Sequence, residues 1–241
     1  HDHIVLRNDL SNILNWCSEW GMLINADKSV FLHVTRKKAP LVFSYSLGSS
    51  SLRSTNSYKY LGVTLTSTLS WSLHINTICS SAFRKLCFLR HKLKNAPSSV
   101  KLLSYISFIR PKLEYACIAW DPHTKSDIKH LEKIQRKSVR FIFNKFARFD
   151  SPSQTMIENS IPTLESRRKR LRLEFLSLLI NNKLAINQSP YISPASTRYT
   201  RHHHPDSLAP YYARTNTFMF SFFPRTISDW NTILQMAMHC D

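Results

Sequence analysis

The sequence predicts an α+β fold, in which a small antiparallel α/β unit is followed by a mainly helical region. Apolar residues of the first part follow a strand-like period of two after one short helix, and from Ser70 onward the period becomes helical. The composition is 43% hydrophobic and 12% aromatic, which is sufficient for a hydrophobic core. We expect three regions, at residues 1–69, 70–146 and 147–241, the last with a polar, proline-rich loop near 187–217.

The first region is predicted to begin with a helix. Its apolar residues recur at helical spacing from Leu6 to Cys17, and Gly21 stands where such a helix would end. Because the chain begins with His1 and enters this helix at once, we expect preceding structure. A turn at Asn25–Lys28 and strands over Leu41–Leu47 and Tyr58–Leu65 are predicted to follow.

Four longer helices are predicted after Ser70, followed by a short aromatic segment over Phe218–Trp230 that packs on the core. Pro111 should kink or divide the second helix, and Thr124 with Asp127 resembles a capping box at the start of the third. The apolar stripe of the first of these helices covers Ile75–Leu93, and the second helix begins at Ser98. The third covers Thr124–Phe146 and the fourth covers Thr163–Leu184.

Gly62 lies inside the predicted strand Tyr58–Leu65. A strand gains no packing from glycine, so the residue indicates either a β-bulge or the close approach of another backbone or a ligand.

The charge predicts a polyanionic partner. The chain has 33 Lys and Arg against 15 Asp and Glu, a formal net charge of +18 and a pI near 10.0. Nucleic acid is the favoured partner, and an anionic membrane surface is the alternative. No apolar run approaches the roughly 18 residues that a spanning helix needs, so no membrane span is expected, and nucleic acid is preferred to a membrane as the partner.

Two basic clusters are candidate contacts to a nucleic-acid backbone. The third helix carries a one-sided row, and the fourth helix begins with five bases in six residues, a cluster that also resembles a nuclear address. A solvated helix face is the alternative for both clusters and explains the row of the third helix equally well. For the fourth helix a functional role is favoured, because bases near a helix N-terminus need a compensating anion. The two sets are Lys129, Lys133, Arg136 and Arg140, and Arg167, Arg168, Lys169, Arg170 and Arg172.

No metal or cofactor site is predicted within the chain. The five cysteines are scattered and fit reduced thiols of an intracellular protein, and no zinc-ligand spacing occurs. No two of the fifteen acidic residues are adjacent, so the paired carboxylates that two-metal phosphoryl transfer requires are missing. The chain alone is therefore predicted to be inactive as an enzyme.

Several short segments, in their order along the chain, resemble the C-terminal part of reverse transcriptases from non-long-terminal-repeat retrotransposons. The match is nearest to jockey-like elements and to arthropod copies described as tick transposons, and it covers nearly the whole chain. The segments that carry it are Ile13–Cys17 with Trp20, Leu23–Lys28, Tyr60–Val63, Trp71 with His74, Arg110–Ala116, Trp120–Pro122, Leu131–Arg136, Arg140–Ile142, and Ser221–Ile227 with Trp230 and Asn231.

The resemblance implies the end of a polymerase palm over residues 1–69, a helical thumb over 70–146 and a basic C-terminal extension. It implies that Tyr60, Leu61 and Gly62 form a primer grip, where Gly62 leaves room for nucleic acid. Lys28 matches a palm lysine on the pyrophosphate side, supported by Asn25; from the residues alone, Lys28 is an ordinary turn lysine.

The resemblance further implies that the metal-binding aspartates lie upstream of His1, so that Mg²⁺ is expected only in the complete polymerase. The implied partners are an RNA template, a DNA primer and the N-terminal polymerase portion, and the expected location is intracellular and nuclear. Two alternatives remain: a non-catalytic nucleic-acid-binding or interaction module, domesticated or decayed, and an unstructured relic. The ending Trp230–Gln235 departs from the family pattern, as a decayed copy would.

Overall fold

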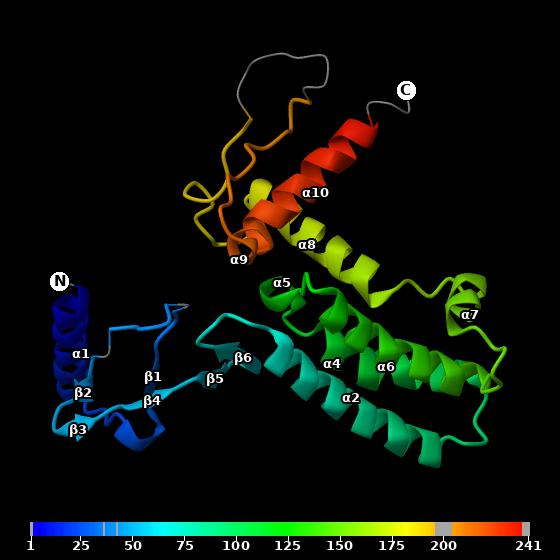
Figure 1. The fold of residues 1–241 in the computed structure, drawn as a ribbon, viewed down its shortest axis with the longest axis horizontal. Helices are drawn as coiled ribbons and strands as arrows, with labels where there is room; N and C mark the ends of the chain where they lie inside the picture. The colour runs from blue at the N-terminus through cyan, green and yellow to red at the C-terminus, as the bar shows by residue number, and fades with distance from the viewer. Residues whose placement is uncertain (1, 36, 42, 196–203, 238–241) are drawn as a thin grey trace. The chain divides into compact units, whose positions relative to one another are not determined.

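The computed structural model describes residues 2–35, 37–41, 43–195 and 204–237 (Figure 1). The chain divides into two compact units, His1–His74 and Ile75–Asp241. This division lies between residues 74 and 75, whereas the sequence places its first boundary between 69 and 70. The structure is α+β, with small strand pairs and a helical C-terminal part, as predicted from the sequence.

The first unit begins with the predicted helix, α1 (Asp2–Glu19). Gly21 adopts a positive φ of 62° and ends it, and the amide of Met22 donates to the carbonyl of Cys17 at 2.8 Å. A short 3₁₀ turn, η1 (Ala26–Lys28), occupies the predicted turn.

Three two-stranded pairs complete this unit. Two pairs are antiparallel, as expected: β2 (Ser46–Leu47) with β3 (Ser50–Ser51), and β5 (Ser57–Tyr60) with β6 (Val63–Thr66). The third pair, β1 (Val30–Leu32) with β4 (Arg53–Thr55), is parallel. Of the strand predicted over Leu41–Leu47, only Ser46–Leu47 is strand among the described residues.

The prediction that Gly62 lies inside a strand is wrong. Tyr58–Leu65 is a hairpin, in which Tyr60 pairs with Val63 across the two-residue loop Leu61–Gly62. Both loop residues have positive φ, 45° for Leu61 and 87° for Gly62, as a type I′ turn requires. The right-handed twist of the two strands favours this turn, so Gly62 is explained by backbone geometry without a bulge.

The first unit buries little apolar surface. Among its described residues, Cys17 and Val63 are the buried hydrophobic side chains. Large apolar side chains of α1 are exposed instead, at Ile4, Val5, Leu6, Ile13 and Trp16, as is Trp20 directly after the helix. This unit therefore presents an apolar surface that a self-sufficient domain would cover.

The second unit begins within α2 (Ser72–Lys92), whose predicted apolar stripe is buried at Ile75, Cys79, Ala82, Leu86 and Leu89. Pro111 divides the next helix as predicted, because proline supplies no backbone N–H to the ladder. The helix runs as α3 (Ser98–Ser104), a π-helical turn η2 (Tyr105–Ile109) and α4 (Arg110–Glu114).

The central helix of the second unit is α6 (Lys125–Phe143), which follows the short α5 (Cys117–Trp120). It buries apolar residues such as Leu131, Ile134 and Ile142, and ends where Asn144 adopts a left-handed φ of 53°. Thr124 occupies the N-cap position of α6, but its side chain does not cap the helix as a capping box would. Its hydroxyl donates instead to Asp127 Oδ2 at 2.6 Å.

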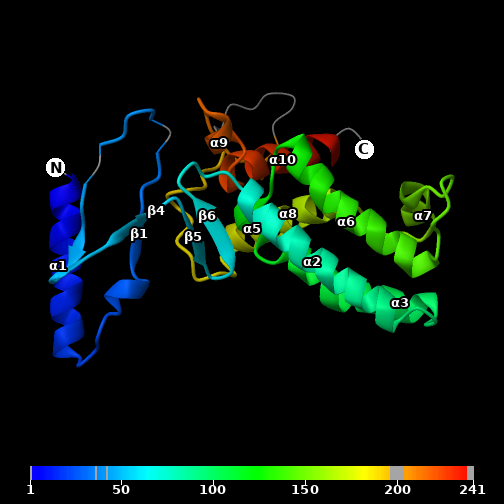
Figure 2. The ribbon, with the colours of Figure 1, turned by 60° about the horizontal axis from the view of Figure 1, so that its bottom comes forward.

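The remaining helices are α7 (Pro152–Glu158), α8 (Leu164–Ile180), α9 (Asn216–Met219) and α10 (Phe222–Ala237). Both views show α7 near the C-terminal end of α6 and α10 against α8 (Figures 1 and 2). Leu176 of α8, Leu208 of the loop between α8 and α9, and Ile227 of α10 form a buried apolar contact. The predicted aromatic closing segment thus packs on the core.

Candidate nucleic-acid interface

Two arginines of the basic run at the start of α8 contact one buried aspartate, Asp121. Arg168 Nε donates to Asp121 Oδ1 at 2.6 Å, and Arg172 Nε donates to Asp121 Oδ2 at 2.9 Å. Arg225 of α10 reaches the same Oδ2 at 3.2 Å and also donates to the backbone carbonyls of Asp121 and Pro122. We call Asp121, Arg168, Arg172 and Arg225 the arginine cluster.

Burial rules out backbone binding by the two inner arginines in this structure. Arg168 is 0% exposed and Arg172 is 2% exposed, so no phosphate can reach their guanidinium groups. Arg172 additionally contacts Asp229 at 3.0 Å and donates to Thr226 Oγ1 at 3.2 Å. The prediction that Arg168 and Arg172 bind nucleic acid is corrected accordingly: both hold helices together.

The other three bases of α8 are also paired. Arg167 forms a bidentate pair with Glu114, and this hydrogen bonding raises the pKa of Arg167 above its usual value. Lys169 contacts Asp229 at 2.8 Å, and Arg170 contacts Glu174 at 3.2 Å on the exposed face. The compensating anions that the helix N-terminus requires are therefore acidic residues of the chain itself.

Two side chains of α6 cap α8. Gln135 accepts from the amide of Leu164 at 3.2 Å and donates to the carbonyl of Pro162 at 2.9 Å. Glu132 Oε1 accepts from the amide of Glu165 at 2.9 Å. Since these amides have no partner within their helix, the two side chains fix the start of α8 on α6.

The basic row of α6 is more accessible than the run on α8. Lys129 and Lys133 are exposed, and Arg136 is half-buried beside Glu132. Arg140 is half-buried and donates to the carbonyl of Asp150 at 3.3 Å. Within the described part of the chain, no carboxylate forms an ion pair with any of the four. This row is the surface of the second unit most suited to phosphates.

In the first unit, Asn25 and Lys28 are local neighbours. The side-chain oxygen of Asn25 accepts from the amide of Lys28 at 3.1 Å and so caps η1. Lys28 itself is exposed. Asn25 therefore supports the backbone that carries Lys28, and the Lys28 side chain is open to a ligand.

The hairpin tip presents an exposed apolar surface. Tyr60 is 60% exposed and Leu61 is 72% exposed. At the base of the hairpin, His74 Nδ1 accepts from the amide of Thr64 at 3.2 Å. Burial lowers the pKa of His74, and the nearby charge of Lys59 lowers it further, so the imidazole is held neutral as an acceptor.

The described cysteines are free thiols. Burial raises the pKa of Cys79 to about 12 and that of Cys117 to about 11, which makes both unreactive. Cys87 is exposed, and Cys240 lies outside the described residues.

Neither a metal cluster nor a membrane span occurs in the described ranges. No three His, Cys, Asp or Glu side chains among those residues gather as a metal would require. No described helix is both long and apolar enough to cross a bilayer.

Three curated proteins of Drosophila melanogaster match part of the chain. The probable RNA-directed DNA polymerase from transposon X-element is 30% identical over 132 residues, 53% of this chain. The probable polymerase from transposon BS is 23% identical, and that from mobile element jockey is 28% identical, each over 57% of this chain.

Over about half of its length, the chain is similar to RNA-directed DNA polymerases of transposons. The matched part amounts to 14–16% of the length of these polymerases. No family model matches the chain, and no solved structure matches it.

Three of the segments that carry the sequence resemblance hold structural contacts of the second unit. Trp120–Pro122 supplies Asp121 to the arginine cluster, and Ser221–Ile227 supplies Arg225 and Thr226. Leu131–Arg136 supplies the two caps of α8. The only sequence signal for these pairings was the need for an anion near the bases of α8.

Proposed function

We propose that the chain is the primer- and template-holding part of a reverse transcriptase from a jockey-like, non-long-terminal-repeat retrotransposon. The observation that carries the proposal is the similarity to three transposon RNA-directed DNA polymerases, which covers 53–57% of the chain. The second unit then serves as the thumb and C-terminal extension, and the first unit as the end of the palm.

The α6 row supports a role in holding nucleic acid. Lys129 and Lys133 are separated by one helical turn and point from the exposed side of α6, so they can contact successive phosphates. Arg136 and Arg140 continue the row with less exposure. None of the four shows a sequence-reading arrangement, so we expect binding by charge and shape to an RNA template paired with a DNA primer.

The first unit supports the palm assignment. Its hairpin tip offers exposed Tyr60 and Leu61 to the sugar and base surface of a primer, and Lys28 offers a free ammonium to a departing pyrophosphate. We propose that the N-terminal polymerase portion covers the exposed apolar side chains of α1 and supplies the aspartates that hold Mg²⁺. The much greater length of the relatives supports such a portion.

Binding to an RNA–DNA duplex across a salt series tests the proposal. We expect the logarithm of the association constant to fall steeply and linearly with the logarithm of salt concentration, because phosphate contacts release counterions. Incubation of the chain with primer, template, deoxynucleotides and Mg²⁺ should yield no extension. A flat salt response, or extension by the chain alone, would contradict the proposal.

A non-catalytic nucleic-acid-binding module is the second candidate. The observation that favours it is the arginine cluster, which gives the second unit a buried, internally paired centre. A stable protein of this length made in cells, with duplex binding and no longer product, would support this alternative. A longer product containing the chain would support the polymerase.

We also propose an intracellular, nuclear location. Since all five bases of the α8 run are paired with acidic residues, a nuclear address there would have to compete with those pairs. Imaging of the tagged chain tests the location, and cytoplasmic retention would contradict it.

A further inference from the structure

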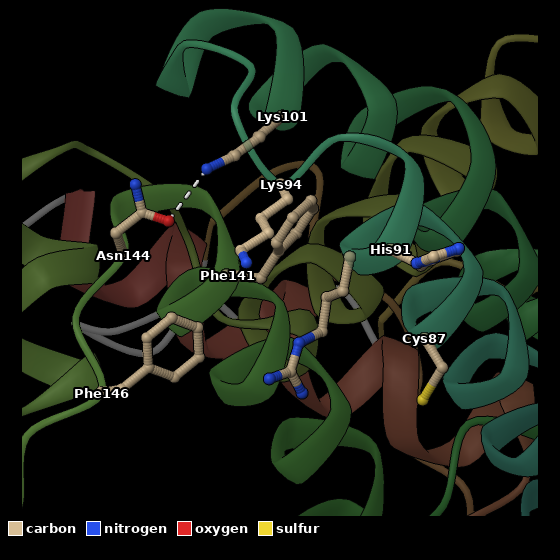
Figure 3. A pocket seen from close by; sticks show the side chains of 8 residues that line it. Cys87, His91, Lys94, Lys101, Phe141, Asn144 and Phe146 are labelled. Carbon is tan, nitrogen blue, oxygen red and sulfur yellow. Dashed lines mark hydrogen bonds between the residues drawn. The ribbon is translucent and has the colours of Figure 1, made fainter.

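A basic pocket lies in the second unit, where the end of α2, the start of α3 and the end of α6 meet. Its volume is about 420 Å³, within the range of small-ligand sites. Figure 3 shows Lys94, Lys101 and Asn144 gathered on one side of it, with Phe146 on another. None of these residues belongs to the clusters considered above.

Lys101 is the unusual member of this pocket. It is 1% exposed, and its Nζ donates to Asn144 Oδ1 at 2.9 Å. An ammonium has three donor protons, and a buried charge ordinarily has a counter-charge. In the residues that the structure describes, no carboxylate forms an ion pair with Lys101, and its second contact is the ring of Phe141, 5.4 Å from Nζ.

The other ionisable side chains of the pocket are bases as well, apart from the thiol of Cys87. Arg90, His91 and Lys94 line it together with Lys101, and none of the described residues that line it is acidic. Four basic side chains around one cavity favour an anion, which would supply the counter-charge that Lys101 does not receive from the described chain.

An aromatic side chain is placed beside these bases. Phe146 is 50% exposed, and the guanidinium carbon of Arg90 lies 5.3 Å from its ring centre. An exposed ring next to basic groups is the combination with which proteins hold unpaired nucleotides, since the ring stacks on a base while the charges hold a phosphate.

We infer that this pocket binds one nucleotide of a single-stranded nucleic acid, with a phosphate on the exposed Arg90 and Lys94, the charge of buried Lys101 in the pocket wall attracting it, and the adjacent base against Phe146. The inference rests on the proposed function and refines it, because it separates a single-strand site from the duplex contacts of the α6 row. A duplex keeps its bases stacked and cannot offer one to Phe146.

Binding measurements on the full chain test this inference, with a fluorescent single-stranded oligonucleotide and an RNA–DNA duplex as probes. Lys101→Met removes the charge and keeps the apolar stem, and Phe146→Ala removes a side chain that is 50% exposed. Each should weaken single-strand binding about tenfold, and change duplex binding less than about twofold. Lys129→Gln is the matched control, which should weaken binding to the duplex and leave single-strand binding nearly unchanged.

Several outcomes separate the two proposals. If the wild-type chain binds neither probe, the proposed function fails. If it binds both, and Lys101→Met and Phe146→Ala leave single-strand affinity unchanged while far-ultraviolet circular dichroism shows folded variants, the pocket inference alone is overturned. Should Lys101→Met not fold, Phe146→Ala and Lys94→Gln decide in the same way.

A free phosphate or pyrophosphate ion could occupy the same basic pocket in place of a nucleotide. Pyrophosphate should compete weakly with the oligonucleotide, and a label on Cys87, which lines the pocket, should respond to both ligands in a Cys240→Ser background. A response to pyrophosphate with none to the oligonucleotide would overturn the inference in favour of a free phosphate.

Discussion

Asp121 and Arg168 form a buried ion pair across 47 residues of sequence, with Nε and Oδ1 2.6 Å apart. Because Arg172 and Arg225 use the second oxygen of the same carboxylate, Asp121 joins the segment after α5 to α8 and α10. The arginines that looked most like a nucleic-acid site in the sequence are therefore the centre of the fold of the second unit.

Loss of the Asp121 charge should destabilise the second unit strongly. Asp121→Asn leaves three arginines around a neutral amide, and breaking a buried pair in this way costs roughly 3–5 kcal/mol. Chemical denaturation measures the loss.

Two control variants sharpen that prediction. Glu174→Gln breaks the exposed pair with Arg170 and should cost less than about 1 kcal/mol. Arg168→Met should cost less than Asp121→Asn, because Asp121 keeps two arginines and the two terminal nitrogens of Arg168 have no hydrogen-bond partner among the residues that the structure describes. Equal losses for Asp121→Asn and Glu174→Gln would contradict a structural role for the arginine cluster.

The hairpin tip allows stability and binding to be separated. Leu61→Asn should stabilise the hairpin by about 1 kcal/mol, because asparagine tolerates positive φ and Asn-Gly is favoured in type I′ turns. If the apolar tip contacts a primer, the same variant should bind the RNA–DNA duplex more weakly despite its stability.

Gly62→Ala is the opposite test of that turn. Alanine at a φ of 87° should destabilise the hairpin by about 1 kcal/mol. Thermal unfolding of both variants measures the effects, and a stabilising Gly62→Ala would show that the turn is not of this type.

Glu132 should make stability depend on pH. Burial raises its pKa above 4.5, and this outweighs the opposing hydrogen bond from the Glu165 amide and the charges of Arg168 and Arg136. The folded chain therefore holds the proton more tightly than the unfolded chain, so ionisation removes stability as pH rises from 4.5 through the folded pKa.

Glu132→Gln keeps the acceptor for the Glu165 amide but cannot ionise. Its free energy of unfolding, relative to wild type, should rise across that pH window and stay constant above it. A difference that falls with pH would indicate that the charge of Glu132 stabilises the fold through Arg168.

Local patterns were sufficient to predict the longer helices, but not the short α5, α7 and α9. The stripe from Ile75 to Leu89 specifies the buried face of α2, and Pro111 divides its helix, since both effects act within a few residues. Gly62 was misassigned to a strand because a two-residue turn between short strands leaves the alternating pattern almost intact.

The bases of α8 were harder to interpret from the sequence. The run showed that a counter-charge was needed, but Asp121 and Asp229 are distant in sequence, and their pairing depends on how the helices pack. The burial of Lys101 could not be predicted from the sequence, because it results from the packing of α3 against α6.

The most direct test of nucleic-acid holding is the salt dependence of RNA–DNA duplex binding by two matched double variants. Replacing Lys129 and Lys133 with Gln should reduce the magnitude of the log–log slope by about 2, since each phosphate contact contributes roughly 0.9. Replacing Lys169 and Arg170 with Gln should leave the slope nearly unchanged, because both are already paired with acidic residues. The reverse result would place the duplex on α8 and contradict this account.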